Sequence, residues 1–204
     1  MRITVELIQR SYQALNALNE REICLRGMRI VAIENLGATH DQFEVIDLTN
    51  NEIVKLEDSA LLRALTTLLL SNNEISKISA NFGKNMPRLE NLILTGNKIK
   101  DLEQIANLSN CKNLKRLSLL NNFVTSLPNY RLFTIAKIPS LTALDFQKIK
   151  QKEREIAEKM YGEEEDLIDV IEKRKKIDES KMQKKTVDLP YYLKAQEESL
   201  NFTT

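Results

Sequence analysis

One apolar motif recurs along most of this chain at a nearly constant interval. Four complete copies read L-x-x-L-x-L-x-x-N-x-I-x-x-L, with occasional replacement of one apolar residue by another. The asparagines of these copies are Asn51, Asn73, Asn97 and Asn122. A degenerate copy with Met28 in place of asparagine precedes them, and a truncated copy, Leu141-x-x-Leu144-x-Phe146, follows. A period of about 20–29 residues predicts stacked coils that bury their apolar sides against one another.

The pattern is that of a leucine-rich repeat. Each Leu-x-Leu pair predicts a short strand whose alternate side chains lie on opposite faces. We therefore expect an α/β fold, a solenoid whose parallel sheet lines its concave face. An amide side chain both donates and accepts hydrogen bonds, so the asparagines predict a buried ladder between neighbouring coils.

Both open ends of the solenoid need a cap. At the start, Thr4 is a candidate helix N-cap, and apolar residues then recur at helical spacing. They are Val5, Ile8, Tyr12, Leu15 and Leu18. This spacing predicts one capping helix. At the other end we expect a helix over residues 130–137, followed by a last strand in which Leu141, Leu144 and Phe146 complete the sheet.

The composition changes after Gln147. Residues 148–185 are rich in Lys, Arg and Glu and contain no proline, and opposite charges lie three and four residues apart. This favours an exposed helix, while a partly disordered arm remains an alternative. We expect a leucine-rich-repeat domain with its caps over residues 1–161, and a charged tail over residues 162–204.

Several functional classes are disfavoured by the composition. The net charge is +1, and the chain has one histidine and two cysteines. It has neither a phosphate-binding loop motif nor a paired nucleophile and base. No apolar run is long enough to span a membrane. We therefore expect a non-catalytic protein with no cofactor, bound metal, small-molecule substrate or membrane attachment.

The concave face is the usual binding surface of such a solenoid. The predicted partner-binding residues there are Arg26, Val45, Asp47, Thr49, Thr67, Leu69, Ser71, Asn91, Ile93, Thr95, Arg116, Ser118, Leu120 and Asp145. Val45, Leu69, Ile93 and Leu120 form a predicted apolar stripe with charged neighbours, which suits an amphipathic helix of a protein partner. The alternative is that these aliphatic residues reflect strand propensity alone.

A second candidate surface is basic. Lys148, Lys150, Lys152 and Arg154 place four cations within seven positions. Such a cluster is able to contact a phosphate backbone. The alternative is an ordinary solvated helix, because Glu153 and Glu155 are interleaved with the cations.

Two segments outside the repeat carry a more specific resemblance. Residues 34–39 (ENLGAT), followed by 41–43 (DQF) and Ile46-Asp47, form the first. Residues 130–132 (YRL), Pro139, 144–150 (LDFQKIK) and 152–154 (KER) form the second. With these segments the chain resembles the U2 small nuclear ribonucleoprotein A-prime family over about residues 1–161.

The resemblance implies a nuclear splicing adaptor. Members of that family pair with the B-double-prime protein, an RNA-recognition-motif domain, and hold one of its helices on the concave face. The pair binds a stem-loop of U2 small nuclear RNA. Carried onto this chain, the helix-holding role falls on the fourteen concave residues, and Lys148 to Arg154 lie near RNA that is bound mainly through the partner. The alternative is a cytoskeletal or ciliary leucine-rich-repeat scaffold.

Overall fold

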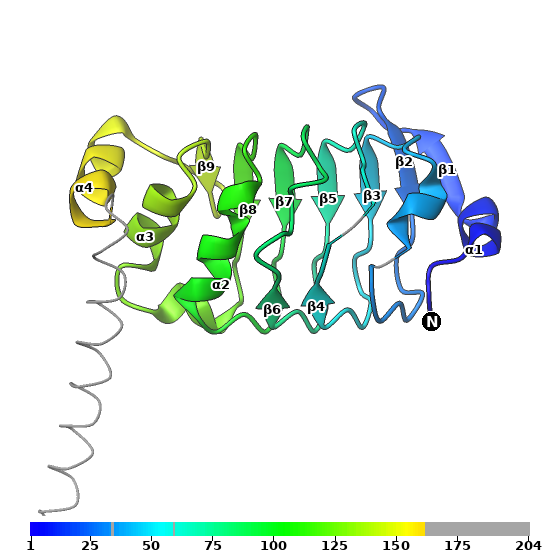
Figure 1. Cartoon of the computed structure of the whole chain (residues 1–204), viewed down its shortest axis with the longest axis horizontal. Helices are drawn as coiled ribbons and strands as arrows, with labels where there is room; N and C mark the ends of the chain where they lie inside the picture. The colour runs from blue at the N-terminus through cyan, green and yellow to red at the C-terminus, as the bar shows by residue number, and fades with distance from the viewer. Residues whose placement is uncertain (34, 59, 162–204) are drawn as a thin grey trace, which may run out of the picture. The chain divides into compact units, whose positions relative to one another are not determined.

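The repeats form one continuous sheet in the computed structural model, which describes residues 1–33, 35–58 and 60–161. The strand order is β1-β2-β3-β5-β7-β8-β9-β10, and a small second sheet pairs β4 with β6. The strands of the main sheet are β1 (Tyr12–Leu15), β2 (Arg21–Cys24), β3 (Val45–Asp47), β5 (Thr67–Leu69), β7 (Asn91–Ile93), β8 (Arg116–Ser118), β9 (Ala143–Leu144) and β10 (Gln147–Lys148). Neighbours from β2 to β9 are parallel, whereas the two outermost pairs are antiparallel. Figure 1 shows the parallel strands β2, β3, β5, β7, β8 and β9 side by side, one from each coil.

The remaining elements connect or cap the coils. They are α1 (Val5–Arg10), α2 (Leu102–Ala106), α3 (Tyr130–Lys137), α4 (Gln151–Tyr161), the 3-10 turns Leu36–Thr39, Asn107–Asn110 and Phe123–Ser126, and the short strands β4 (Lys55–Leu56) and β6 (Lys77–Ile78). None of the helices in the described part of the chain has the length and apolar character needed to cross a membrane. Within the same ranges, no group of three or more His, Cys, Asp and Glu side chains is placed to hold a metal ion.

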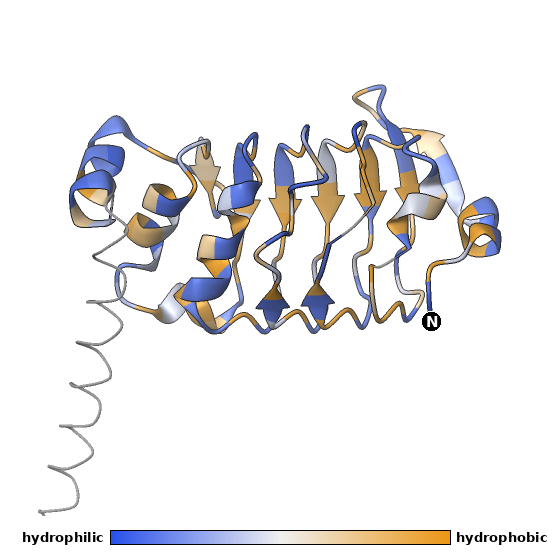
Figure 2. Cartoon of the chain, in the orientation of Figure 1, coloured by the Kyte–Doolittle hydropathy of each residue, from blue (hydrophilic) through white to orange (hydrophobic). Residues whose placement is uncertain are grey.

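The core lies on the inner side of the sheet. The middle residue of each parallel strand points inward and is fully buried, as are the leucines that follow two positions later, for example Leu68 and Leu70. Figure 2 shows the apolar colour concentrated on β3, β5 and β7. Burial of each such leucine contributes about 1.5–3 kcal/mol to folding.

The asparagine ladder is confirmed. Asn97 Nδ2 donates to the carbonyls of Leu70 and Leu94, both at 2.9 Å, and its Oδ1 accepts from Ile75 N–H at 3.0 Å. The amides of Asn51, Asn73 and Asn122 repeat this arrangement. All four asparagines are buried. Each amide therefore joins its own coil to the preceding one.

The prediction for the N-terminal cap is partly wrong. Thr4 does cap α1, since its Oγ1 accepts from Leu7 N–H at 3.1 Å. The helix ends at Arg10, however, and residues 12–15 form β1, which pairs antiparallel with β2 (Figure 1). The physical reason is that β2 would otherwise present unpaired backbone groups at the open edge of the sheet. The Asn16 side chain stabilises the connecting turn by accepting from Leu18 and Glu20 N–H.

The C-terminal cap is confirmed for the helix over residues 130–137, which is α3. The last strand differs from the prediction. Leu141 and Leu144 are buried, but Phe146 is 76% exposed. Asp145 and Phe146 have φ of 51° and 61° and form the turn between β9 and β10. This turn sends the phenyl ring outward, so Phe146 does not complete the core.

The charged segment after Gln147 begins with a helix. α4 packs against α3, where the rings of Phe133 and Tyr161 meet edge to face at 5.6 Å between centroids. The rest of that segment and the predicted tail, residues 162–204, lie outside the described residues. The division into residues 1–161 and 162–204 stays a prediction.

Candidate partner-binding face

The concave face, meaning the sheet surface that faces away from the core, carries side chains in three rows. Strand register places Val45, Thr67, Asn91, Arg116 and Ala143 in the first row. It places Asp47, Leu69, Ile93 and Ser118 in the second row. Just beyond the strands, carbonyl-to-amide bonds between coils align Thr49, Ser71, Thr95 and Leu120 in the third row.

The predicted apolar stripe is not a straight row. Val45 lies in the first row, Leu69 and Ile93 in the second, and Leu120 in the third. Only Leu69 and Ile93 are register partners. The stripe therefore crosses the face obliquely, and its centre is the Leu69–Ile93 pair, whose side chains are both half-buried.

The expected exposure is wrong for four of the predicted residues. Val45 is 4% exposed, because its short side chain lies between Glu22 and Thr67 on the neighbouring strands. Asp47, Thr49 and Ser118 are also buried. Asp47 accepts from Thr49 N–H at 2.9 Å and lies 3.5 Å from the Arg26 guanidinium. These four residues contribute less accessible surface than their alternation along the strands predicts.

Hydrogen bonds link the polar residues of the first row. Asn91 Nδ2 donates to Thr67 Oγ1 at 2.8 Å, and Arg116 Nη1 donates to Asn91 Oδ1 at 2.9 Å. In the adjacent rows, Thr95 and Ser118 share a hydrogen bond of 2.8 Å. Arg116 is thereby held beside the Leu69–Ile93 pair while it stays exposed. It supplies a positioned positive charge at an apolar centre.

A hollow of about 450 Å³ lies over this part of the face. Its residues are Thr67, Leu69, Asn91, Ile93, Arg116, Leu117, Ser118, Ala143 and Phe146. The phenyl ring of Phe146 was missed by the sequence reasoning, which assigned it to the core. The sequence did contain a signal. The truncated copy has no asparagine at the ladder position, and in the complete copies that asparagine hydrogen-bonds the carbonyl of the leucine equivalent to Phe146.

Asp145 falls within the predicted last strand, and this placement is wrong. β9 ends at Leu144, and the carboxylate of Asp145 turns toward the cap. Its Oδ1 accepts from Leu119 N–H at 2.7 Å, and its Oδ2 accepts from the Tyr130 hydroxyl at 2.9 Å. Both carboxylate oxygens thus serve the C-terminal end of the solenoid.

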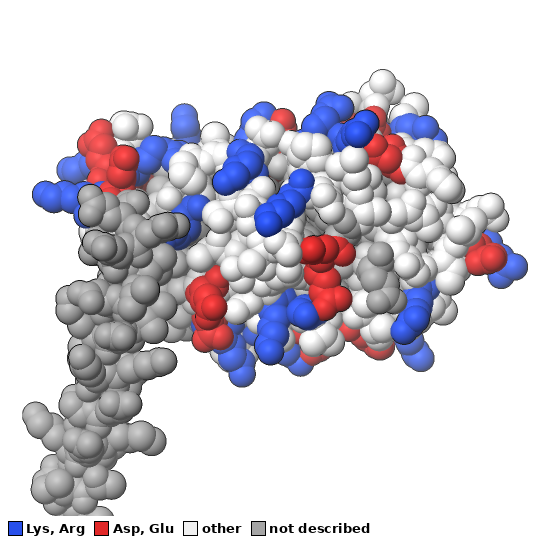
Figure 3. Space-filling model, viewed as in Figure 1, with Lys and Arg blue, Asp and Glu red and all other residues white. Residues whose placement is uncertain are grey.

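The four basic residues are divided by the structure. Lys148, Lys150 and Lys152 are exposed around the start of α4. Arg154 instead donates to the carbonyls of Pro139 and Leu141 at 2.7 and 2.6 Å. These bonds fix α4 to the segment between α3 and β9. Figure 3 shows both signs of charge interspersed over the face in view. The three lysines contribute exposed positive charge at this end of the repeats.

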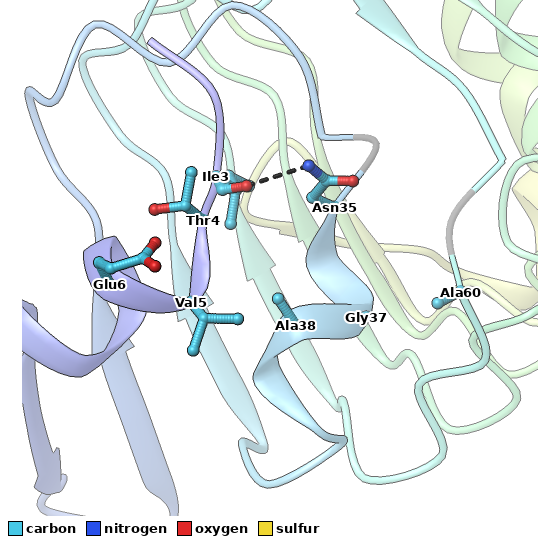
Figure 4. A pocket seen from close by; sticks show the side chains of 8 residues that line it. All are labelled: Ile3, Thr4, Val5, Glu6, Asn35, Gly37, Ala38 and Ala60. Atoms are coloured by element: carbon cyan, nitrogen blue, oxygen red, sulfur yellow. Dashed lines mark hydrogen bonds between the residues drawn. The ribbon is translucent and has the colours of Figure 1, made fainter.

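A second hollow, of about 550 Å³, lies beside α1 and is drawn in Figure 4. Short aliphatic side chains such as Val5 and Ala38 form much of its wall. The Asn35 amide points toward the Ile3 carbonyl and donates to it at 3.1 Å. This polar group therefore serves the fold at that point, in contrast to the exposed guanidinium of Arg116.

Comparisons with known proteins agree with this architecture. A leucine-rich-repeat family model matches residues 1–171. The U2 small nuclear ribonucleoprotein A′ of Arabidopsis thaliana is 48% identical over 165 residues, which are 81% of this chain and 66% of that protein. The Homo sapiens protein of the same name is 48% identical over 161 residues, which are 79% of this chain and 63% of that protein. The probable U2 small nuclear ribonucleoprotein A′ of Drosophila melanogaster is 41% identical over 179 residues, covering 87% of this chain and 68% of that protein.

A solved structure is also similar. The crystal structure of the Drosophila melanogaster SNF/U2A′ complex matches with a TM-score of 0.78 and 43% identity, over 85% of this chain and 99% of that chain. The chain spans 66% and 63% of the length of the Arabidopsis and human relatives. From the repeat architecture and these matches together, the chain belongs to the U2 small nuclear ribonucleoprotein A′ family of leucine-rich-repeat proteins.

Proposed function

We propose that this chain is a non-catalytic adaptor of the U2 ribonucleoprotein that acts in pre-mRNA splicing in the nucleus. Its partner is an RNA-recognition-motif protein of the B-double-prime type, held on the concave face. Relatives at 48% identity carry the name of a U2 ribonucleoprotein component. A relative of known structure is solved in complex with the SNF protein.

The hollow on the concave face is the observation that carries this proposal. It combines the apolar Leu69, Ile93 and Phe146 with the guanidinium of Arg116. An apolar centre beside a fixed charge fits one helix of a protein partner, with an apolar residue entering the hollow and a carboxylate facing Arg116. A row of Leu and Ile alone would fix neither the orientation of the partner helix nor the choice of partner.

We propose that U2 small nuclear RNA is bound mainly through the partner. The chain has a net charge of +1, which is too small for strong binding to a polyanion by itself. Bases of single-stranded RNA are read by stacking and edge contacts on the sheet of an RNA-recognition motif. Lys148, Lys150 and Lys152 add phosphate contacts from this chain when the complex forms.

Titration calorimetry with the purified B-double-prime-type protein of the same organism tests the concave face. The double variant Leu69→Arg/Ile93→Arg is expected to weaken binding by at least about 100-fold, because two charges replace the half-buried apolar centre that the partner would cover. Val54→Arg is the matched control, because Val54 is 52% exposed and immediately precedes β4 of the small second sheet, outside the concave rows. Circular dichroism confirms folding of each variant. A folded double variant that binds like wild type contradicts the proposal.

The RNA part is tested separately with a U2 stem-loop RNA. Replacing Lys148, Lys150 and Lys152 by Gln is expected to lower the salt dependence of RNA binding by the complex, with the affinity for the protein partner unchanged. Tight, sequence-selective RNA binding by the isolated chain would contradict the proposal that RNA is bound mainly through the partner. Absence from nuclei together with co-sedimentation with tubulin would favour a cytoskeletal scaffold instead.

A further inference from the structure

The turn between β9 and β10 presents an aromatic side chain in an uncommon backbone conformation. Phe146 has φ of 61° and is 76% exposed, yet its ring borders the hollow that contains Leu69 and Ile93. Positive φ is unfavourable for a bulky side chain, and such a residue persists only where its surroundings hold it. The contacts behind the turn show what holds it.

Tyr130 of α3 supports one side of the turn. Its ring is buried, and its hydroxyl donates to Asp145 Oδ2 at 2.9 Å. Burial and the negative charge of Asp145 raise the pKa of Tyr130, so the hydroxyl keeps its proton and remains a donor. The other oxygen of Asp145 accepts from Leu119 N–H. The residue immediately before Phe146 is thus fixed at both carboxylate oxygens.

Arg131, the next residue of α3, supports the two strands that flank the turn. Its guanidinium donates to the carbonyl of Leu144 in β9 at 3.2 Å and to that of Lys148 in β10 at 3.4 Å. It also forms a two-point ion pair with Glu153 of α4, at 2.7 and 3.2 Å. Arg131 therefore holds both strands and ties them to α4.

We propose that Phe146 is an aromatic anchor for the helix of the protein partner, and that Tyr130 and Arg131 are positioning residues that hold it at the edge of the concave face. This inference rests on the proposed function and names a contact within it. The occupant is an amphipathic helix of the RNA-recognition-motif protein. Its apolar side enters between Phe146 and the Leu69–Ile93 pair, and an acidic residue faces Arg116, whose positive charge lies in the same hollow.

The arrangement has a clear physical advantage. A large, rigid side chain carried by a turn that is already ordered loses less conformational freedom on association than one carried by a mobile segment. A phenyl ring that stands at the edge of an apolar hollow also excludes water from the contact, which is typical of residues that dominate binding energy. Without Tyr130 and Arg131, the turn would have to be ordered when the partner binds.

The test measures partner affinity by titration calorimetry for the full chain and its variants. Phe146→Asn removes the ring, while asparagine tolerates positive φ, so the turn is kept. It is expected to weaken binding at least about 10-fold, whereas Phe146→Tyr keeps the affinity. Phe123→Asn is the matched control, because Phe123 is also exposed, at 61%, but lies in a 3-10 turn outside the hollow. It is expected to leave the affinity unchanged.

The positioning role is tested by a double-mutant cycle. Tyr130→Phe is expected to weaken binding about 3- to 10-fold through the loss of one hydrogen bond. In the Phe146→Asn background it is expected to have no further effect, because it acts through Phe146. Tyr161→Phe, at another buried tyrosine of the same cap, is expected to leave the affinity unchanged in both backgrounds.

Two results overturn the inference while leaving the proposed function standing. One is wild-type affinity in Phe146→Asn when Leu69→Arg/Ile93→Arg abolishes binding. The other is an effect of Tyr130→Phe that is equal in both backgrounds, which would show general destabilisation. Failure of the wild-type chain to bind the B-double-prime-type protein overturns both the inference and the proposed function.

Discussion

The carboxylate of Asp145 accepts a hydrogen bond from the backbone N–H of Leu119 at 2.7 Å. In the preceding coils the equivalent N–H groups, those of Leu25, Leu48, Leu70 and Leu94, donate to a backbone carbonyl of the next coil, each at 2.8 Å. After Leu144 the chain instead turns back into β10, which pairs antiparallel with β9. A side-chain oxygen therefore takes the place of the missing carbonyl, and Asp145 ends the ladder without an unpaired buried donor.

Replacing Asp145 by Ala tests this ending. Leu119 N–H and the Tyr130 hydroxyl both lose their acceptor in a buried region, so we expect a loss of about 2–4 kcal/mol in the free energy of unfolding. Urea denaturation followed by circular dichroism measures it. Asp101→Ala is the control, because Asp101 is exposed and its side chain makes no capping hydrogen bond to α2. Equal, small losses in the two variants would show that the carboxylate is dispensable.

The asparagine ladder predicts a specific order of stabilities at one position. Asn97→Ala removes the acceptor for Ile75 N–H and the donor to Leu70 of the preceding coil, together with the donor to Leu94 in its own coil. This loss is expected to cost about 1–3 kcal/mol. Asn97→Asp keeps the acceptor but places a negative charge against the carbonyls of Leu70 and Leu94, so it is expected to cost more than alanine. Urea denaturation of the three proteins ranks them. An aspartate variant as stable as wild type would contradict the assigned hydrogen bonds.

The Arg131–Glu153 ion pair predicts that the free energy of unfolding depends on pH in the acidic range. The hydrogen bond from Arg131, followed by that from Lys150 N–H, lowers the pKa of Glu153 from 4.5 to about 2. Because the folded pKa is depressed, the stabilisation is present above the unfolded pKa and is lost as the pH falls toward 2. We expect Glu153→Gln to be less stable than wild type at pH 7, and the difference to shrink between pH 4.5 and 2.

Urea denaturation at several pH values measures this difference. Glu155→Gln is the control, since Glu155 is exposed and accepts only a contact from Gln151 at 3.3 Å among the described hydrogen bonds. Its difference from wild type is expected to stay small throughout. A Glu153→Gln difference that does not change with pH would remove Glu153 as the titrating group.

Alanine substitutions at two glycines with positive φ distinguish the cost of backbone strain from the cost of overpacking. A Cβ at Gly83 (φ 87°) would meet Cys111 Sγ and lie 3.2 Å from the Cys111 backbone nitrogen, whereas a Cβ at Gly27 (φ 67°) has no atom within 4 Å. Gly27→Ala is expected to cost about 1 kcal/mol from backbone strain. Gly83→Ala is expected to cost about 1–3 kcal/mol more because of overpacking. Thermal unfolding compares them, and equal losses would contradict the close packing at Cys111.

The asparagines illustrate what repetition makes predictable. The same apolar spacing and the same amide occur in four successive copies, and each coil meets a neighbour of the same kind. Local pattern and tertiary environment therefore agree, and inward leucines, parallel pairing and buried amides follow directly. The α3 helix and the Thr4 cap were also predictable, because both depend on local sequence.

The ends of the repeat array follow a different rule. Tyr12 and Leu15 have helical spacing with Val5 and Ile8, but they form β1 because the open edge of β2 needs a hydrogen-bonding partner. Phe146 has the spacing of a core residue, but within residues 1–161 no further repeat coil packs behind it, and its side chain is exposed. In both places the outcome depends on which backbone groups remain unpaired, a property of the assembled sheet.

The amino-acid sequence by itself determined the solenoid and its core, since these depend on a pattern repeated every 22 to 25 residues. It also indicated the family, through two segments that lie outside the repeat. The tertiary structure decided the shape of the candidate binding face. It buried Val45 between neighbouring strands, tied Arg154 and Asp145 to the cap, and placed Phe146 at the hollow that Leu69 and Ile93 also line. Such proximities depend on strand register and on the conformation of one turn, and neither can be read from residue spacing along the chain.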